Sequence, residues 1–469
     1  MSDSRNRPEG SRRDFFKWMG VGSAAALAAG HLPGCTSGGA AISGSIGAEA
    51  RRFKARDLRF DMAQLGFLRG IEPQTPNGDE ALYPNRIGSY SKGLAHDAIG
   101  EVLPASYQSF LHALSTGYSG DFELIQMGGP RPQTSPQSGL GFDLEGPDPG
   151  VIAMPAPPAF ASAEIAGEAV ELYWMAHLRD LGFPDYATDA LAATAIADLN
   201  QLSVYRGPKV SGVVTPSTFL RGETPGDLIG PFLSQYLWRD VPFGSHLMSQ
   251  RMETTLAGDD HLVNFIDWRN VQNGAAVQAY AFDPVRRYIR NLRDLAEWVH
   301  VDALYQAYLQ ACLIMLDDQV PLTPGNPYRN AYTKQAAFAT GGGPHILSLV
   351  CEVATRALKV VWYQKWFVHR RLRPEAYGGR AHIHMTGQAQ YPLHADVLNS
   401  QALIENFSRH GTYFLPMAFP EGSPTHPSYG AGHAVVAGAC TTILKAWFDE
   451  TTPILNPVMA STDGLSLVP

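Results

Sequence analysis

The sequence predicts an all-α fold, in which helical bundles are joined by long loops rich in proline and glycine. Apolar residues recur at the spacing of an amphipathic helix through several segments, and the alternation typical of a half-buried strand is scarce. The chain contains 46 glycines and 34 prolines, more than average usage, which favours many ordered loops over one long coiled coil.

Length and charge limit the class of protein. The chain has 469 residues, of which 45% are hydrophobic, enough to bury a large core. Its 36 Lys and Arg residues against 44 Asp and Glu give a formal net charge of −8. Broad binding of nucleic acid needs a basic surface, so no nucleic-acid partner is expected.

The first 35 residues have the pattern of a twin-arginine export signal. The segment SRRDFFK at 11–17 precedes an apolar run at 21–30 that is too short to span a membrane. The sequence LPGC at 32–35 resembles a lipoprotein cleavage site, which would make Cys35 the point of a lipid anchor. A plain cleavage site with an incidental cysteine is the alternative. We therefore expect export by the twin-arginine route to the periplasm or cell surface.

The remaining chain is expected to form a tether, 36–51, and a helical domain, 52–469. The tether is mostly small and polar, as in flexible linkers. A stretch rich in proline and glycine at 128–158 excludes regular helix or a central strand, so it is expected to be a long surface excursion. Helical spacing predicts helices in the segments 162–181, 185–202, 286–316, 345–370 and 434–448. The strongest of these signals is at 286–316.

The helix predicted at 345–370 ends in cations set between large aromatic residues. At about 100° per residue, an arc of roughly 80° on this helix and its continuation carries Trp362, Lys365, His369 and Arg373. Pro374 disfavours the α conformation at Arg373, so the helix is expected to finish there and leave the guanidinium able to turn into a pocket. Two permanent cations on one face indicate an anion site. The alternative is a solvated basic end that complements the helix dipole, the role expected of Arg370 and Arg371.

A loop with two histidines, PEGSPTHPSYGAGH at 420–433, precedes the last predicted helix. Gly432 and His433 should therefore lie at a helix N-terminus, where free amides and the helix dipole favour an oxyanion. His433 is a candidate acid or base near neutral pH, and His426 is a second titratable group across the loop. A lone histidine is more often structural, but two in one loop beside a cationic helix favour a functional site.

These motifs together resemble those of the vanadium-dependent haloperoxidases, which share a core with type-2 phosphatidic acid phosphatases. The motifs are Lys365, Arg373-Pro374, His426-Pro427-Ser428-Tyr429 and Gly432-His433. The step of eight residues from Lys365 to Arg373, with Lys-Trp and Arg-Pro-Glu-Ala around it, is similar to the bromoperoxidase branch. Similar stretches at 90–102, 230–235 and 299–316 extend the resemblance over most of the predicted domain.

The resemblance implies a helical-bundle fold and a vanadate cofactor held by Lys365, Arg373 and the amide of Gly432. In that family, vanadium keeps one oxidation level and activates hydrogen peroxide as a Lewis acid for attack by halide. His433 would be the acid-base group and His426 the residue that tunes the handling of peroxide or halide. The expected substrates are hydrogen peroxide, bromide or iodide and a small organic molecule, and the expected assembly is a homodimer.

Two positions depart from the family pattern. Position 431, serine in the usual Ser-Gly-His, is alanine, which removes a hydroxyl donor worth ~1.5–3 kcal/mol in a hydrogen bond to a charged group. The family's final motif supplies another arginine and the histidine that bonds to vanadium, whereas residues 434–469 contain neither residue type. No covalent metal ligand is therefore expected in this chain, which would be a C-terminally truncated member with impaired activity.

Other functions remain as alternatives at this stage. Phosphate resembles vanadate in shape and charge, so an acid phosphatase is one, and an exported anion-binding remnant without catalysis is another. A metal site formed by His382, His384 and His394 is a weaker candidate, because no pattern of carboxylate ligands lies nearby. Cys312, Cys351 and Cys440 are scattered and fit no disulfide framework or zinc spacing. The nucleophile elbow, the HExxH helix and the P-loop are absent from the sequence.

Overall fold

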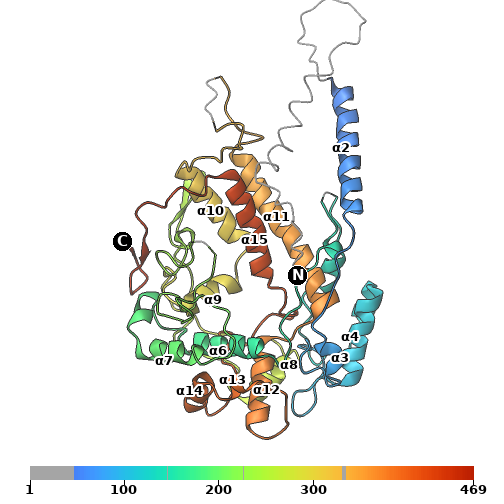
Figure 1. The fold of residues 1–469 in the computed structure, drawn as a ribbon, viewed down its shortest axis with the longest axis vertical. Helices are drawn as coiled ribbons and strands as arrows, with labels where there is room; N and C mark the ends of the chain where they lie inside the picture. The colour runs from blue at the N-terminus through green and yellow to red at the C-terminus, as the bar shows by residue number, and fades with distance from the viewer. Residues whose placement is uncertain (1–46, 145, 225, 330–333) are drawn as a thin grey trace, which may run out of the picture.

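The computed structural model describes residues 47–144, 146–224, 226–329 and 334–469, and these ranges are mostly helical (Figure 1). The predicted export signal and its Cys35 lie outside the described residues, as does the predicted tether up to residue 46. In the part of the chain that the structure describes, no helix is both long and apolar enough to cross a lipid bilayer.

Three long helices pack as a bundle that supports the candidate site. They are α10 (Gln306–Asp317), α11 (Gly343–Tyr363) and α15 (Gly432–Trp447) (Figure 1). Pro344 occupies the first turn of α11, where its missing amide hydrogen costs no helical bond. The seam between the helices buries Cys312, Val350, Ala354, Cys440 and Trp447. Large apolar side chains buried in this way each stabilise the fold by about 1.5–3 kcal/mol, so the bundle is a firm support.

A second group of helices lies below this bundle in the view of Figure 1. It comprises α6 (Ala163–His177), α7 (Ala190–Leu199), α8 (Phe265–Gln272), α12 (Pro374–Met385), α13 (Ala395–Leu398) and α14 (Gln401–His410). Five of these helices begin at a side chain that accepts a first-turn amide: Ser162, Asp189, Asn264, His394 and Ser400. Their shared core is built around Trp174 and Trp268, both fully buried.

The N-terminal helices lie on the side of α11 away from α10 (Figure 1). They are α2 (Ala48–Leu68), α3 (Asp79–Leu82), α4 (Pro104–Thr116) and α5 (Ser119–Phe122). Tyr90 and Phe110 pack against the indole of Trp366 at ring distances of 5.5 and 6.0 Å, which fixes α4 to the end of α11. The helix α2 extends away from the rest of the fold and buries none of its residues (Figure 1).

Strands are few, as the sequence predicts. One hairpin pairs β1 (Val241–Phe243) with β2 (His246–Met248), antiparallel, with Val241 opposite Met248. The other pairs β3 (Met459–Ala460) with β4 (Leu467–Val468), with Met459 opposite Val468. Short 3-10 turns are η2 (Pro136–Leu140), η3 (Pro149–Val151), η4 (Phe183–Ala187) and η5 (Gln235–Leu237).

Three expectations from the sequence need correction. The tether predicted to reach residue 51 ends earlier, because Ala48 and the following residues form the first turn of α2. The stretch 128–158 contains only 3-10 turns but is not simply a surface excursion, since η2 packs against α11 and a Cβ on Gly139 would lie 2.8 Å from the backbone of Tyr363. The helix predicted at 286–316 is two helices, α9 (Leu292–His300) and α10.

Candidate active site

The site begins where α11 changes its winding. After Tyr363 the chain makes a π-helical turn, η6 (Gln364–His369), and the amide of Arg370 donates to the carbonyl of Lys365 at 3.1 Å. Arg370 has a positive φ of 36° and ends the turn, and Arg373 is the extended residue before α12. The helix therefore stops before Arg373, as Pro374 predicts, but earlier than expected. π-Helical turns are frequent at functional sites.

Lys365 is buried without a carboxylate partner. Its side chain is 1% exposed, and Nζ donates to the carbonyls of Pro427 at 2.7 Å and Ser428 at 3.2 Å. Nζ also lies 5.7 Å from the ring centre of Trp362. Burial, followed by the positive charge of Arg373, lowers the pKa of Lys365 to about 6. An ammonium group in this position is stabilised strongly by any anion that approaches it.

Arg373 is the second cation of the site. Its Nη1 donates to the carbonyl of His426 at 3.4 Å, while its Nε is fully enclosed without a hydrogen-bond partner among the described residues. Enclosure of the guanidinium lowers the pKa of Arg373. Across the described ranges, no carboxylate lies within ion-pair distance of Lys365 or Arg373. Two neighbouring cations in this state are costly unless an anion completes the site.

The neighbouring arginines behave differently from the sequence-based interpretation. Arg370 donates to both carboxylate oxygens of Glu80, at 2.6 and 3.0 Å, and Arg371 donates to Glu168 at 2.5 Å. Their side chains are only 17% and 12% exposed, so the two residues are ion-paired and largely covered rather than solvated. Among the described residues, Lys365 and Arg373 are therefore the cations at this end of α11 that form no ion pair, although the charge of Glu375 acts on Arg373.

His426 is held as a neutral ring. Its Nδ1 lies 2.9 Å from the carbonyl of Pro427, which makes Nδ1 the donor and leaves Nε2 as an acceptor, and its ring centre lies 4.8 Å from that of Trp362. Burial, then Arg373 and Lys365, lower the pKa of His426 to about 2. Burial and the two neighbouring cations therefore favour the neutral form of this histidine.

The pKa of His433 shifts in the opposite direction, upward. It is the second residue of α15, and its Nε2 lies 3.2 Å from each carboxylate oxygen of Asp302. The hydrogen bond with Asp302 raises the pKa of His433, and its side chain is 58% exposed. This histidine can carry a proton near neutral pH and exchange it with solvent.

The first turn of α15 presents uncapped amides. Gly432 opens the helix after Ala431, whose side chain provides no capping hydrogen bond. A Cβ on Gly432 would lie 3.5 Å from the indole of Trp362, an ordinary contact, so protein packing alone does not require glycine there. The indole of Trp362 thus lies beside Lys365, His426 and Gly432, between the cationic turn and the N-terminus of α15.

The chain has close relatives among characterised proteins. It is 36% identical over 496 aligned positions to the vanadium-dependent bromoperoxidase of Corallina pilulifera, an alignment that covers 86% of this chain and 83% of that protein. It is 32% identical over 426 positions to the enzyme of the same name from Ascophyllum nodosum, covering 85% and 75% of the two chains. This chain belongs to the vanadium-dependent bromoperoxidases. No family model matches the sequence.

The fold of this bromoperoxidase agrees with a solved structure. The second vanadate-dependent bromoperoxidase of Ascophyllum nodosum, described as homohexameric, superposes with a TM-score of 0.86 at 27% identity and covers 95% of this chain and 79% of that one. The all-α fold and the family predicted from the motifs are therefore confirmed.

The prediction that four residues of this bromoperoxidase share one helix face is only partly correct. Trp362, Lys365 and Arg373 meet around the loop that carries His426, but the chain turns at Arg370 instead of presenting one helical face. His369 is 6% exposed with neither ring nitrogen hydrogen-bonded, and burial lowers its pKa to about 4. His369 is thus a neutral, enclosed ring packed 5.1 Å from Tyr429.

Sequence reasoning missed a buried ion pair that supports the bromoperoxidase site. Lys92 Nζ donates to Glu375 at 2.6 Å and to the carbonyls of Glu421 and Ser423 at 2.7 and 2.5 Å. Burial lowers the pKa of Lys92 to about 8, and the charge of Lys92, with that of Arg373, holds the pKa of Glu375 at about 2. Lys92 lies in the segment Tyr-Ser-Lys-Gly-Leu at 90–94, whose sequence gives no sign that the lysine is buried.

Asp302 was also missed, because it falls inside the segment that sequence spacing assigns to one helix. The break between α9 and α10 releases this residue from helical geometry, and its carboxylate reaches His433. The histidines considered as a metal site are placed otherwise: His382 stacks on Phe414 at 4.0 Å, and His384 Nδ1 accepts the amide of Tyr391. Among the described residues no cluster of three or more His, Cys, Asp or Glu fits a metal ion.

Proposed function

We propose that this chain oxidises bromide or iodide with hydrogen peroxide to hypohalous acid, using vanadate bound between Lys365, Arg373 and the first amides of α15. The observation that carries the proposal is a pair of cations that form no ion pair with any described carboxylate, beside an uncapped helix N-terminus. Both features fit a tetrahedral oxyanion, which accepts charge-assisted hydrogen bonds from amides and cations. The names of the relatives support the choice of vanadate.

Bound vanadate supplies a Lewis acid that activates hydrogen peroxide at a constant oxidation level of the metal. Lys365 and Arg373 bind and neutralise the oxyanion, and the carbonyls of Pro427 and Ser428 aim the ammonium group of Lys365. The indole of Trp362 shields this ammonium group from water on one side. In a site of reduced dielectric, these fixed charges act more strongly than they would in water.

His433 holds and moves protons in this scheme. Asp302 orients the ring and raises its pKa, so a protonated imidazole at the start of α15 is available near neutral pH as a proton donor. His426 has the complementary role, because its Nδ1 is engaged with Pro427 and its Nε2 can accept a hydrogen bond from hydrogen peroxide. His433 thus acts as the proton donor and His426 as the hydrogen-bond acceptor.

Bromination of a phenolic dye by the purified chain tests the proposal. Turnover should require vanadate, hydrogen peroxide and bromide together, and phosphate should compete with vanadate. His433→Ala should lower kcat by about 10²–10⁴-fold, the usual range for a general acid or base. His345→Ala is a matched control, because His345 lies at the far end of α11 against Trp447. Vanadate binding without turnover would favour the non-catalytic alternative, and phosphoester hydrolysis without vanadate would favour the phosphatase.

Export and self-association are further parts of the proposal. The twin-arginine pattern at 11–17 supports export, tested by fractionation of cells carrying Arg12→Lys with Arg13→Lys, which should retain the protein inside the cell. The homohexameric state of the structural neighbour supports association of this chain with further copies of itself, rather than the homodimer expected from the sequence. The lipid on Cys35 stays a prediction, tested by mass spectrometry of the exported protein.

A further inference from the structure

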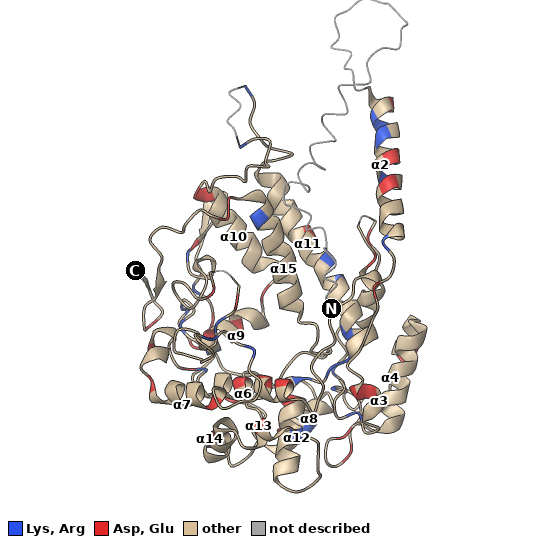
Figure 2. Ribbon diagram, viewed as in Figure 1, with Lys and Arg blue, Asp and Glu red and all other residues tan. Residues whose placement is uncertain are grey.

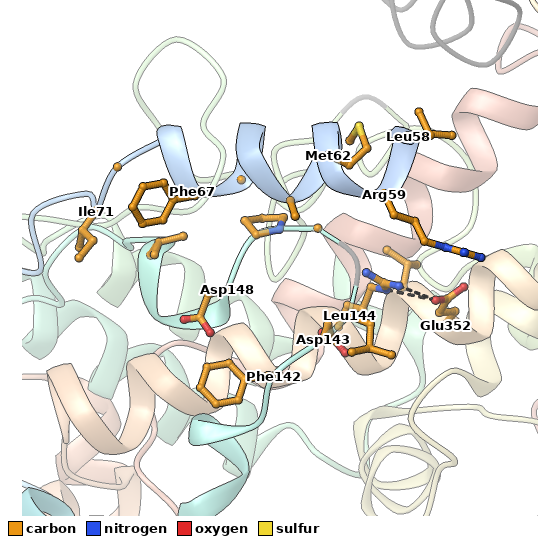
Figure 3. Close-up of a pocket in the computed structure, with 18 of the residues that line it drawn as sticks. Leu58, Arg59, Met62, Phe67, Ile71, Phe142, Asp143, Leu144, Asp148 and Glu352 are labelled. Carbon is orange, nitrogen blue, oxygen red and sulfur yellow. Dashed lines mark hydrogen bonds and ion pairs between the residues drawn. The ribbon is translucent and has the colours of Figure 1, made fainter. Parts of the chain in front are cut away.

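The groove beside α2 holds charged side chains that are already paired within the chain. It has a volume of about 850 Å³ and lies between α2 and the loop that carries Asp143 (Figure 3). Glu352 pairs with Arg356 at 2.7 Å, and Asp143 pairs with Lys359. A charged ligand would have to displace one of these pairs. A much smaller cavity, beside Arg373, contains polar groups without a partner among the described residues.

The cavity beside Arg373 has a volume of about 70 Å³ and lies between α6 and α12. One wall is the segment Arg371–Pro374, and another is formed by Tyr377 and Gly378 of α12. The helix α6, which packs against α12, completes the lining with five residues: Ile165, Glu168, Ala169, Leu172 and Tyr173. Because Arg373 lines this cavity, the cavity adjoins the candidate vanadate site.

Three hydrogen-bond donors of the cavity lining are buried without an acceptor among the described residues. They are Nε of Arg371, Nε of Arg373 and the hydroxyl of Tyr377. Tyr377 is 3% exposed, and the side chain of Arg371 is 12% exposed. The Nε of an arginine can only donate, and a buried donor without an acceptor is costly. These groups therefore predict that the cavity holds a species that accepts hydrogen bonds.

The helix α6 brings one carboxylate to the cavity. Its three glutamates are red in Figure 2: Glu164, Glu168 and Glu171. Glu164 pairs with Arg206, and Glu171 accepts from the hydroxyl of Tyr205 at 2.7 Å; neither glutamate lines the cavity. Glu168 does line it, but its carboxylate already accepts from Nη2 of Arg371 at 2.5 Å. This carboxylate leaves Nε of Arg371 without an acceptor.

The cavity lining has an excess of positive charge. It contains two guanidinium groups, those of Arg371 and Arg373, and one carboxylate, that of Glu168. Glu168 pairs with Arg371, whereas Arg373 forms no ion pair with a described carboxylate, although the charge of Glu375 acts on it. Because a charge acts strongly in a site of reduced dielectric, an anion is favoured over a neutral acceptor such as water.

The size and the apolar walls of the cavity indicate which anion fits. A volume of about 70 Å³ has room for one or two species of the size of water, which takes up about 30 Å³. A tetrahedral oxyanion carries four oxygens of about that size and is too large, whereas a single halide ion fits. Ile165, Leu172 and Leu415 replace none of the water shell that an ion loses on entry. Large halides lose less hydration energy than fluoride, so bromide and iodide are favoured.

We propose that this cavity binds one bromide or iodide ion between Nε of Arg371, Nε of Arg373 and the hydroxyl of Tyr377, and that it is a substrate subsite next to the vanadate site. The choice of a halide among small anions rests on the proposed function, whereas the three donors without an acceptor are independent of it. Arg373 belongs to both sites, so a single guanidinium group separates the halide from the bound oxyanion.

Diffraction from crystals of the full chain, grown with vanadate and sodium bromide, locates the ion directly. Bromine has an absorption edge, so data collected on both sides of that edge distinguish bromide from water and chloride. An anomalous peak is expected inside the cavity, within hydrogen-bond distance of the Tyr377 hydroxyl and the two Nε atoms. A cavity that holds only water, with bromide confined to the protein surface, overturns the proposal.

Bromine-81 nuclear magnetic resonance measures the affinity in solution, because bromide that exchanges with a protein site gives a broadened line. Vanadate is present to fill the neighbouring oxyanion site. Tyr377→Phe should raise the dissociation constant for bromide at least tenfold, and Arg371→Lys, which keeps a cation for Glu168 but removes Nε, should act in the same direction. The matched control is Tyr186→Phe, because the Tyr186 hydroxyl is also buried without a partner but lies outside this cavity. Equal effects of Tyr377→Phe and Tyr186→Phe overturn the proposal.

Steady-state kinetics test whether the bound halide serves turnover. Tyr377→Phe should raise the KM for bromide at least fivefold and leave the KM for hydrogen peroxide unchanged, which a general loss of stability would not do. An unchanged KM for bromide overturns the role as a substrate subsite. Bromide found in the cavity of a chain that brominates nothing would contradict the proposed function but support the halide site. Bromination by a chain whose cavity holds only water would contradict the halide site alone.

Discussion

Lys365 Nζ donates to the carbonyl of Pro427 at 2.7 Å, so the end of α11 is tied to the loop that leads into α15. A carbonyl satisfies one hydrogen of the ammonium group but does not neutralise its charge. An approaching anion would therefore favour the protonated form of Lys365, whose pKa burial lowers and whose position is already fixed by the fold. Arg373 is placed in a similar way, because its Nη1 donates to the carbonyl of His426 and it forms no ion pair with the carboxylates that the structure describes.

Replacement of Lys365 by methionine should weaken vanadate binding by about 10–150-fold, since one charge-assisted hydrogen bond contributes about 1.5–3 kcal/mol. Isothermal titration calorimetry with vanadate measures the change. Lys359→Met is the matched control, because Lys359 lies on the same helix but pairs with Asp143 at the surface. Equal losses in the two variants would contradict a ligand role for Lys365.

Arg373→Lys should also weaken vanadate binding, although the charge is kept. A lysine cannot reproduce the planar fork of the guanidinium or place a donor where Nε now lies without a partner. Calorimetry should show at least a tenfold loss of affinity. Arg371→Lys, which alters a cation already paired with Glu168, should leave vanadate affinity unchanged.

Ala431→Ser should tighten vanadate binding and stabilise the protein. Residue 431 is the exposed, extended N-cap residue of α15, where a hydroxyl can accept a first-turn amide and contribute about 0.5–2 kcal/mol. The same hydroxyl can instead donate to the oxyanion when vanadate is bound. Thermal unfolding with and without vanadate separates the two effects, and an unchanged vanadate affinity would place this hydroxyl outside the site.

Asp302→Asn should lower the pKa of His433, because the hydrogen bond to a carboxylate is what raises it. The raised pKa contributes stability that is fully present below the ordinary value of about 6.5 and is lost as pH rises through the folded-state value. The variant should therefore lose stability in acid and not in base. Nuclear magnetic resonance titration of His433 measures the change in pKa, and urea unfolding in acid and in base measures the change in stability.

Lys92→Met should destabilise the protein by about 3–5 kcal/mol, because it leaves Glu375 charged and buried without its partner. Lys92→Met combined with Glu375→Gln should lose less, since no uncompensated charge remains. The pair also predicts acid sensitivity: the pKa of Glu375 is lowered to about 2, so its contribution is present above about 4.5 and lost as pH falls toward 2. Urea unfolding of the three proteins measures these differences.

The sequence predicts the local parts of this structure better than the contacts between them. The helix after Gly432 and the stop before Arg373 follow from glycine, proline and apolar spacing, which act over a few residues. The partners of those residues are distant in the chain: Asp302 reaches His433 across 131 positions and Lys92 reaches Glu375 across 283. Apolar spacing continues through Asp302, so only the folded chain shows that the helix breaks there.

The widened turn at Gln364–His369 has a consequence for variation in this protein. Upstream of the turn, α11 presents the side chains that interlock with α15, and downstream of the turn the chain carries Arg373, the second cation of the site. A uniform helix would lock both orientations to a single phase. The widened turn separates the two phases, so substitutions that reshape the interlocking segment need not displace Arg373. Deleting a single residue from positions 366–369 would shift Arg373 relative to Lys365 while leaving the upstream interlock intact.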